Sequence, residues 1–123
     1  MDTKKRVLLV EDEADIRSIY AEILTEAGFE VIQAADGEAG LKLATTEAWD
    51  ILLLDIMLPG EDGIHVLKAI KTHPELTKRP ILLLTNLENE TIITECFDMG
   101  ADGYLIKSEI TPDYIVTEVK NFI

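Results

Sequence analysis

Short apolar runs alternate with helical patterns along the whole chain. The first helical pattern predicts a core-facing stripe that ends at Gly28. Its members are Ile16, Ile19, Tyr20, Ile23, Leu24 and Ala27. The apolar runs predict strands and lie near residues 6–10, 30–34, 51–54, 80–84 and 103–106. Strands that alternate with helices form right-handed βαβ units, so the pattern predicts an α/β fold with a mostly parallel sheet.

Glycine and proline residues predict where the other helices begin and end. The second helix is expected to open at Asp36-Gly37, and the third to follow Gly63 and end before His73-Pro74. The fourth is expected to end near Gly100, and the fifth to begin at Thr111-Pro112. The central apolar runs are apolar at every position, which predicts strands covered by helices on both faces of the sheet.

Polar side chains follow four of the five apolar runs. They are Glu11 and Asp12 after the first run, Asp55 after the third, Thr85 after the fourth and Lys107 after the fifth. Ligands of open α/β sheets bind outside the carboxyl ends of the strands, which all lie at one edge. We therefore expect an acid pair, a single aspartate, a hydroxyl and an amine to share that edge.

These residue types suit a divalent cation and a phosphoryl group. Two carboxylates 4 Å apart repel by about 4 kcal/mol at an effective dielectric of about 20, and a bound cation relieves this repulsion. Oxygen ligands without histidine or cysteine favour Mg²⁺ or Mn²⁺ over zinc. A carboxylate can also attack phosphorus and form an aspartyl-phosphate, whose transition state needs positive charge around its oxygens.

Each of these residues also has an ordinary structural interpretation. Asp55 could form a turn, and Glu11 and Asp12 could favour the dipole of the helix that follows. Thr85 could cap a helix, and Lys107 could be a solvated loop lysine. The order of the four types, each after a buried strand, favours the functional interpretation.

Length and charge limit the remaining possibilities. The chain has 123 residues, 47% of them hydrophobic, and we expect one domain over residues 1–123, with no output domain after the fifth helix. Its net charge is −13, from 24 acidic and 11 basic residues. This excess of acid argues against direct binding to nucleic acid and favours cations and basic partner surfaces.

The single cysteine and the apolar pattern bear on location. Cys96 allows no internal disulfide and fits a reducing cytosol. No apolar stretch approaches membrane-spanning length, and residues 1–6 do not form a signal peptide. We therefore expect a cytoplasmic protein without a membrane partner.

The joint pattern resembles the response-regulator receiver domain of two-component signalling, over essentially the whole chain. Residues 7–13 (VLLVEDE) are similar to its first strand and acid pair, and residues 55–63 (DIMLPGEDG) to its phospho-acceptor loop. Residues 84–86 (LTN) are similar to its hydroxyl site, and residues 100–107 (GADGYLIK) to its last strand and lysine. One such motif is a weak signal, whereas four in order are highly specific.

The resemblance implies a flavodoxin-like, doubly wound sheet of five parallel strands in the order 2-1-3-4-5, with helices on both faces. It implies a phospho-accepting module that takes a phosphoryl group from a histidine kinase or a phosphotransfer protein. The phosphorylated form would then alter the surface of the fourth helix, fifth strand and fifth helix for a downstream output protein. Catalysis would be limited to the domain's own phosphoryl transfer and dephosphorylation.

The resemblance also implies a role for each site residue. Asp55 is the phospho-acceptor, Thr85 and Lys107 hold the phosphoryl oxygens, Tyr104 is a switch aromatic that turns inward as Thr85 moves, and the Mg²⁺ ligands are Glu11, Asp12, Asp55 and the Met57 carbonyl. Three positions depart from the family pattern: Glu61, Asn86 and Ser108. Because Ser108 stands where most members have proline, the Lys107–Ser108 peptide could be cis or trans.

Three alternatives stay open on the residues alone. The first is a pseudo-receiver, a binding module of this fold that is not phosphorylated. The second is a hydrolase with an aspartyl-phosphate intermediate, although Met57 stands where such enzymes usually place a second aspartate. The third is a flavin- or nucleotide-binding fold, although no glycine-rich phosphate loop follows the first strand. For Tyr104, an ordinary half-buried strand aromatic is the alternative.

Overall fold

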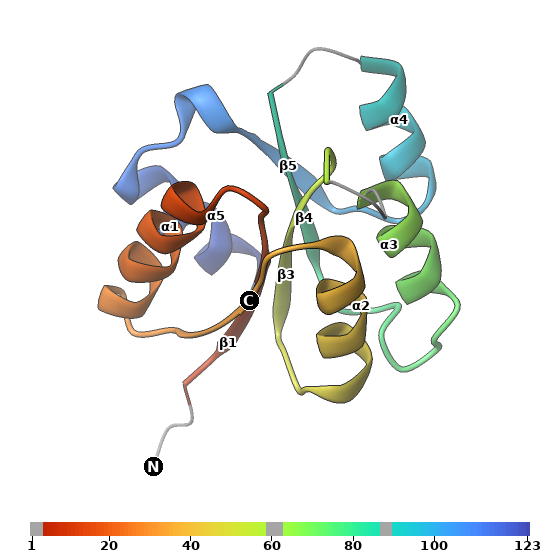
Figure 1. The fold of residues 1–123 in the computed structure, drawn as a ribbon, viewed down its shortest axis with the longest axis horizontal. Helices are drawn as coiled ribbons and strands as arrows, with labels where there is room; N and C mark the ends of the chain where they lie inside the picture. Colours follow the sequence, from red (N-terminus) through yellow and green to blue (C-terminus); the bar gives the residue numbers. More distant parts are fainter. Residues whose placement is uncertain (1–3, 59–62, 87–89) are drawn as a thin grey trace.

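The computed structural model describes residues 4–58, 63–86 and 90–123 as five strands and five helices that alternate, plus one short 3₁₀ helix (Figure 1). The strands are β1 (Arg6–Val10), β2 (Glu30–Ala34), β3 (Ile51–Asp55), β4 (Ile81–Thr85) and β5 (Gly103–Ile106). The helices are α1 (Ala14–Glu26), α2 (Gly37–Thr46), α3 (Gly63–Lys71), α4 (Glu90–Asp98) and α5 (Pro112–Phe122), and the 3₁₀ helix is η1 (Lys107–Glu109). The element types and order are those that the sequence predicts.

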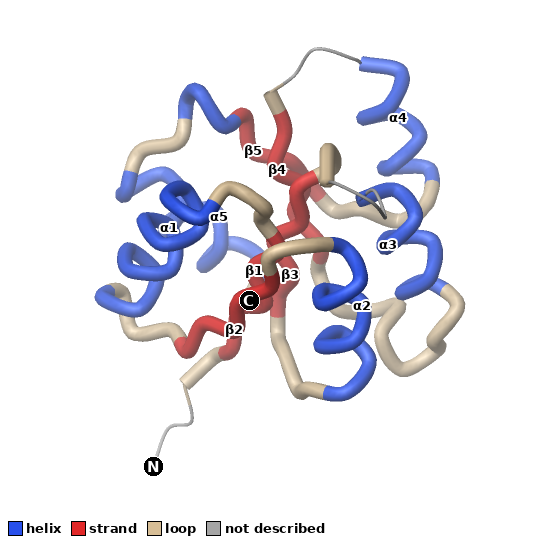
Figure 2. Tube along the Cα trace, viewed as in Figure 1, coloured by secondary structure: helices blue, strands red, loops and turns tan. Residues whose placement is uncertain are grey.

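The five strands form one parallel sheet in the order β2-β1-β3-β4-β5, which confirms the predicted topology (Figure 2). Helices α1 and α5 cover one face of the sheet, and α2, α3 and α4 cover the other (Figure 1). The order places β3 at the centre, between β1 and β4. From β1 the chain adds β2 on one side of the sheet and β3, β4 and β5 on the other, and ligands of doubly wound sheets bind at such a switch in strand order.

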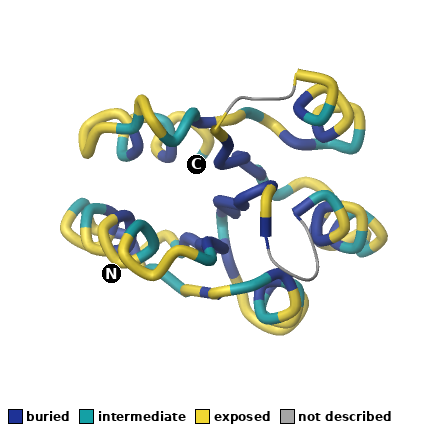
Figure 3. Tube along the Cα trace, turned by 45° about the horizontal axis from the view of Figure 1, so that its top comes forward, coloured by how far each residue is buried: buried dark blue, intermediate teal, exposed yellow. Residues whose placement is uncertain are grey.

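Two apolar clusters fill the space between the sheet and its two helical layers. The central strands are coloured as buried in Figure 3, whereas the helices also carry exposed positions. Successive residues of a central strand belong to opposite clusters: Leu52 and Leu54 pack toward α2, α3 and α4, whereas Ile51 and Leu53 pack toward α1 and α5. All five residues of β3 and of β4 are buried. This double coverage explains why the central runs are apolar at every position.

Two aspartates join the strands at the edge opposite the predicted site. The Asp50 backbone N–H donates to the Arg6 carbonyl at 2.8 Å, and its carboxylate accepts from the Arg6 N–H at 2.7 Å. Asp102 makes the same pair of bonds with Ile81, at 2.9 and 2.8 Å. Each aspartate directly precedes a strand, so these bonds fix where β3 and β5 begin beside their neighbours.

Two details differ from or complete the sequence-based expectations. Ile19 was expected in the buried stripe of α1 but is 54% exposed, because the helix turns Tyr20, Ala21 and Leu24 toward the sheet and leaves position 19 at the margin of the stripe. The described residues contain no cis peptide bond, so the bond before Ser108 is trans. Within the same ranges, no helix is long and apolar enough to cross a membrane.

Candidate functional site

The carboxyl ends of four neighbouring strands carry the predicted site residues. Glu11 and Asp12 directly follow β1, Asp55 is the last residue of β3, and Thr85 is the last residue of β4. Lys107 directly follows β5 as the first residue of η1. Since parallel strands end at the same edge, the fold brings residues separated by up to 96 positions together, as expected.

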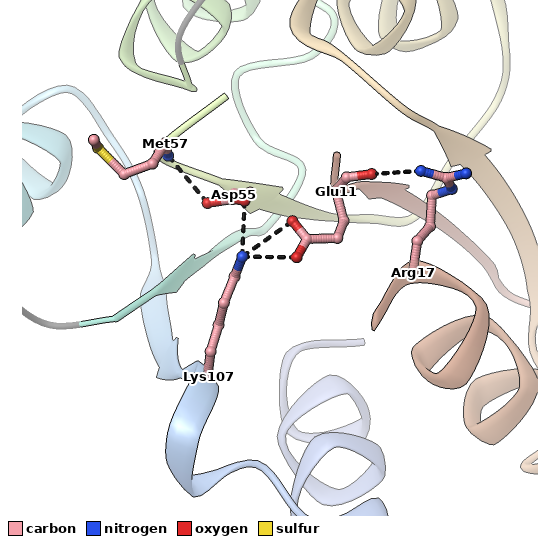
Figure 4. A network of polar contacts seen from close by, with 5 residues as sticks. All are labelled: Glu11, Arg17, Asp55, Met57 and Lys107. Carbon is pink, nitrogen blue, oxygen red and sulfur yellow. Dashed lines mark hydrogen bonds and ion pairs between the residues drawn. The ribbon is translucent and has the colours of Figure 1, made fainter. Parts of the chain in front are cut away.

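Lys107 joins the two central carboxylates through its ammonium group (Figure 4). Its Nζ donates to the two Glu11 carboxylate oxygens at 2.7 and 3.1 Å and to Asp55 Oδ2 at 2.8 Å. The Glu11 side chain is fully buried, and those of Asp55 and Lys107 are 4% and 9% exposed. Charged hydrogen bonds of this length in a buried setting are strong, so Lys107 acts as the internal cation of the cluster.

Burial and the neighbouring charges shift the ionisation of this cluster. Burial, with the Asp55 carboxylate beside it, raises the pKa of Glu11 above its ordinary value, and Lys107 only partly opposes the shift. Burial acts to lower the pKa of Lys107, but its bonds to Asp55 and Glu11 outweigh burial and raise that pKa. The ammonium therefore stays charged, and it is the charged form of Glu11 that burial disfavours.

The donor set of this cluster fits a hard divalent cation. Glu11, Asp12 and Asp55 each offer a carboxylate oxygen, and these atoms lie within 4.8 Å of one another. Opposed oxygens around Mg²⁺ stand roughly 4.2 Å apart, so modest side-chain movement would bring the three into reach. Asp12 is the most accessible of the three, being only partly buried. All three are oxygen donors, as Mg²⁺ and Mn²⁺ prefer.

A backbone N–H contacts the other carboxylate oxygen of Asp55, and the start of α3 lies close behind it. The Met57 N–H donates to Asp55 Oδ1 at 3.0 Å, which closes a tight turn directly after β3. The Gly63 N–H then donates to the Ile56 carbonyl at 2.9 Å, so the start of α3 lies against the end of β3. A Cβ at Gly63 would overlap the Asp55 carbonyl oxygen, and only glycine permits this approach. The Met57 carbonyl as a metal ligand stays a prediction.

Thr85 and Tyr104 belong to the neighbouring strands β4 and β5. Thr85 is 8% exposed, and its register partner in β5 is Ile106, the residue before Lys107. Tyr104 is 40% exposed, and its ring meets Phe97 of α4 edge to face, with 6.0 Å between centroids. A groove of about 500 Å³ beside it is lined by Tyr104, Ile106, Glu109 and Tyr114. Tyr104 is therefore exposed at the surface, and its role as a switch stays a prediction.

Sequence reasoning missed two residues that support the site, Gly63 and Arg17. The sequence analysis places Gly63 before the third helix and at the end of the acceptor loop, but it does not predict the close approach of Gly63 to the Asp55 backbone. Arg17 lies in α1, and its Nη1 donates to the Glu11 carbonyl at 2.8 Å (Figure 4). A charged residue on a helix reads as a solvated position, so the sequence gives no signal for this contact. Pro59, Gly60, Glu61 and Asp62 of the predicted acceptor loop lie outside the described residues.

Comparison with known proteins identifies the family. Residues 7–120 match the family model of the response regulator receiver domain. The alkaline phosphatase synthesis transcriptional regulatory protein PhoP of Bacillus subtilis is 40% identical over 103 residues, which cover 84% of this chain and 42% of PhoP. AfsQ1 of Streptomyces coelicolor, a transcriptional regulatory protein, is 40% identical over 101 residues, or 82% of this chain and 44% of AfsQ1.

A solved structure extends the likeness to the whole fold. The chemotaxis protein CheY4 of Vibrio cholerae superposes with a TM-score of 0.92 at 29% identity, over 98% of this chain and 100% of CheY4. The chain spans less than half the length of the two regulators named above. Because these relatives are named as transcriptional regulators, they do not support the expectation, drawn from net charge, that the protein has no direct contact with nucleic acid. The matched family, the sheet order and the clustered acids agree, and the chain belongs to the response-regulator receiver domains of two-component systems.

Proposed function

We propose that Asp55 accepts a phosphoryl group from a histidine kinase or a phosphotransfer protein. Phosphorylation of an aspartate is general in the receiver family. The observation that carries the assignment to this residue is the position of the Asp55 carboxylate, buried at a strand end between two further acids and the ammonium of Lys107. Asp12 has the more accessible carboxylate, but it lacks the bond to Lys107 that Asp55 has.

The proposed transfer forms one P–O bond and breaks one P–N bond. A carboxylate oxygen of Asp55 attacks phosphorus, and the bond between phosphorus and the imidazole nitrogen of the donor breaks, with its electron pair returning to that nitrogen. Before the transfer, Asp55 Oδ1 accepts from the Met57 N–H and Oδ2 from Lys107. These bonds orient the carboxylate, and Lys107 then offers its charge to the phosphoryl oxygens.

Glu11, Asp12 and Asp55 would hold Mg²⁺ or Mn²⁺, with the Met57 carbonyl as a fourth protein ligand. Such a cation, when bound, supplies positive charge to the phosphoryl oxygens and relieves the repulsion among the acids. Since Lys107 already lies between Glu11 and Asp55, it must share these carboxylates with the cation. The Thr85 hydroxyl would complete the set of phosphoryl contacts from the neighbouring strand.

The same proposal includes a switch of the α4-β5-α5 surface. Thr85 moves toward the phosphoryl oxygen, and Tyr104 turns from its exposed position into the space beneath α4. Because the Tyr104 ring packs on Phe97 of α4, its rotation would change the face presented to a downstream output protein. Residues 1–123 would act as one cytoplasmic receiver domain whose catalysis is limited to its own phosphorylation and dephosphorylation.

Intact mass tests the acceptor. The protein is incubated with Mg²⁺ and acetyl phosphate, and one phosphoryl group is expected on the wild type and none on Asp55→Asn. Asp50→Asn is the matched control, because Asp50 directly precedes the opposite end of β3. The adduct should be labile to hydroxylamine, as an acyl phosphate is. Equal labelling of Asp55→Asn would refute the assignment, and no labelling of the wild type would favour the pseudo-receiver.

Amide chemical shifts test the switch. Beryllofluoride with Mg²⁺, which mimics the acyl phosphate, should perturb residues from Asp55 through Thr85 to Tyr104 and residues 90–108. Asp55→Asn should abolish the whole response. Perturbations confined to Glu11, Asp12, Asp55 and Lys107 would contradict a switch of this kind while leaving the acceptor assignment intact.

A further inference from the structure

Arg17 reaches back from α1 to the loop that carries the acid pair. It is the fourth residue of the helix, and its Nη1 donates to the Glu11 carbonyl oxygen at 2.8 Å (Figure 4). We propose that Arg17 is a positioning residue for the acidic cluster: it fixes the peptide plane between Glu11 and Asp12, and thereby the direction of the Asp12 carboxylate. This inference rests on the metal site proposed above.

Glu11 is held at three points. Its backbone N–H donates to the Ala34 carbonyl at 3.1 Å, its carboxylate accepts from Lys107, and its carbonyl accepts from Arg17. The first two contacts fix the end of β1 and the Glu11 side chain. Only the third, from Arg17, contacts the Glu11 carbonyl, which belongs to the peptide group that joins Glu11 to Asp12.

A held carbonyl also places the residue that follows it. The peptide unit is planar, so the direction of the Glu11 carbonyl fixes the N and Cα atoms of Asp12. The Asp12 carboxylate takes part in none of the hydrogen bonds or ion pairs found within residues 4–58, 63–86 and 90–123. Its position in the cluster therefore depends on the backbone, and Arg17 is the side chain that holds that backbone.

Helix stability does not account for an arginine at this position. A positive charge in the first turns of a helix opposes the helix dipole. The N-cap residue, Glu13, makes no side-chain capping bond that Arg17 could assist. The guanidinium instead donates to one backbone oxygen, the Glu11 carbonyl. Groups that do not touch a metal commonly orient its ligands through hydrogen bonds of this kind.

The positive charge of Arg17 allows an experiment to distinguish an electrostatic role from a positioning role. If Arg17 acted through charge alone, it would repel a cation at Glu11 and Asp12, and its removal would tighten Mg²⁺ binding. If it acts through position, its removal loosens Asp12 and weakens Mg²⁺ binding. The two roles therefore predict opposite changes in the Mg²⁺ dissociation constant.

The experiment is a Mg²⁺ titration of the whole chain, followed by amide chemical shifts. Arg17→Met is expected to raise the dissociation constant about 10-fold, in the range of other groups that orient metal ligands. Arg17→Lys, which keeps the charge and one donor near the carbonyl, should fall between Arg17→Met and the wild type. Lys78→Met, an exposed lysine with the same change in charge, should bind as the wild type does. An unchanged or lower dissociation constant for Arg17→Met would overturn the inference.

A metal-free measurement and one more variant complete the test. Without Mg²⁺, loss of the bond should shift the Glu11 carbonyl ¹³C and Asp12 amide ¹⁵N resonances in Arg17→Met while leaving those of Trp49, at the opposite edge, in place. Absence of this shift also overturns the inference. Asp12→Ala separates the two proposals: if it weakens Mg²⁺ binding and Arg17→Met does not, only the role of Arg17 fails. If Asp12→Ala binds as the wild type does, the metal site fails and the role of Arg17 with it.

Discussion

Replacing Lys107 with methionine removes the internal cation of the cluster and keeps most of the apolar stem. Lys107 Nζ bonds to Glu11 and Asp55 at 2.7 and 2.8 Å, and both carboxylates are almost fully buried. In Lys107→Met these two acids face each other without the ammonium. We expect the variant to fold but to lose a large part of its stability in metal-free buffer.

The magnitude follows from the distances in the cluster. The carboxylate oxygens lie within 4.8 Å of one another. Two unit charges at that separation repel by about 3.5 kcal/mol at an effective dielectric of about 20. Proton uptake by Glu11, whose pKa burial already raises, limits the loss, so we expect a decrease of about 2–4 kcal/mol in the free energy of unfolding. For a chain of this length, that is a fall of roughly 10 °C in melting temperature.

Thermal unfolding with and without Mg²⁺ measures this effect. In metal-free buffer Lys107→Met should melt well below the wild type, whereas Lys78→Met, which alters an exposed lysine, should melt within about 2 °C of it. Added Mg²⁺ should stabilise Lys107→Met more than the wild type, because the ammonium no longer competes for Glu11 and Asp55. If Lys107→Met is as stable as Lys78→Met without Mg²⁺, the ion pairs of Lys107 with Glu11 and Asp55 do not stabilise the fold, and the reasoning is refuted.

Three further predictions concern the supports of the sheet and the site. Gly63→Ala should lower the free energy of unfolding, measured in urea, by about 2 kcal/mol or more, because its Cβ would overlap the Asp55 carbonyl. In the control Gly103→Ala the new Cβ meets a movable Leu82 methyl at 2.9 Å, so the loss should be smaller, and equal losses would contradict this account. Asp102→Ala should cost about 1.5–3 kcal/mol and speed hydrogen exchange at Ile81, whose N–H it holds at 2.8 Å, and an unchanged exchange rate would argue against this role. Trp49→Phe should lower the free energy of unfolding by about 1–2 kcal/mol, because it loses the 3.0 Å hydrogen bond to the Ala44 carbonyl. Arg79→Met removes a guanidinium 5.0 Å from the Trp49 ring and should lower it less. The reverse order would show that the cation matters more than the hydrogen bond.

The sequence predicts the strand-end residues well because their placement depends on topology alone. A parallel sheet brings the carboxyl ends of its strands to one edge, so Glu11, Asp55 and Thr85 must gather once the apolar runs pair as strands. The alternation of runs and helical stripes therefore carries both the fold and most of the candidate site. Lys107 follows from the same rule, since it directly follows β5.

Residues that act through tertiary contacts are not visible in the pattern. Arg17 donates to a backbone oxygen, which every residue has, so no particular residue type in the sequence indicates its partner. Gly63 matters because the start of α3 lies against the Asp55 and Ile56 backbone, and a sequence pattern does not show such a tertiary contact. The exposure of Ile19 depends on which side of α1 faces the sheet, and a helical period alone gives only the width of the apolar stripe.

The charges and the register of the site suggest how phosphorylation would reach the surface. With all groups ionised, Lys107 neutralises one of the three acids, and a divalent cation matches the charge that is left. Lys107 now contacts Asp55 Oδ2 at 2.8 Å, and a phosphoryl group on Asp55 would give its ammonium new oxygen acceptors, so we expect Lys107 to shift toward the phosphoryl group. Lys107 directly follows β5, and the register partner of Thr85 is the residue before it, Ile106. Both contacts expected to move on phosphorylation therefore act on the end of β5, two or three residues from Tyr104, and this convergence is a physical reason to expect the response on β5 and α4 rather than on β2 and α2.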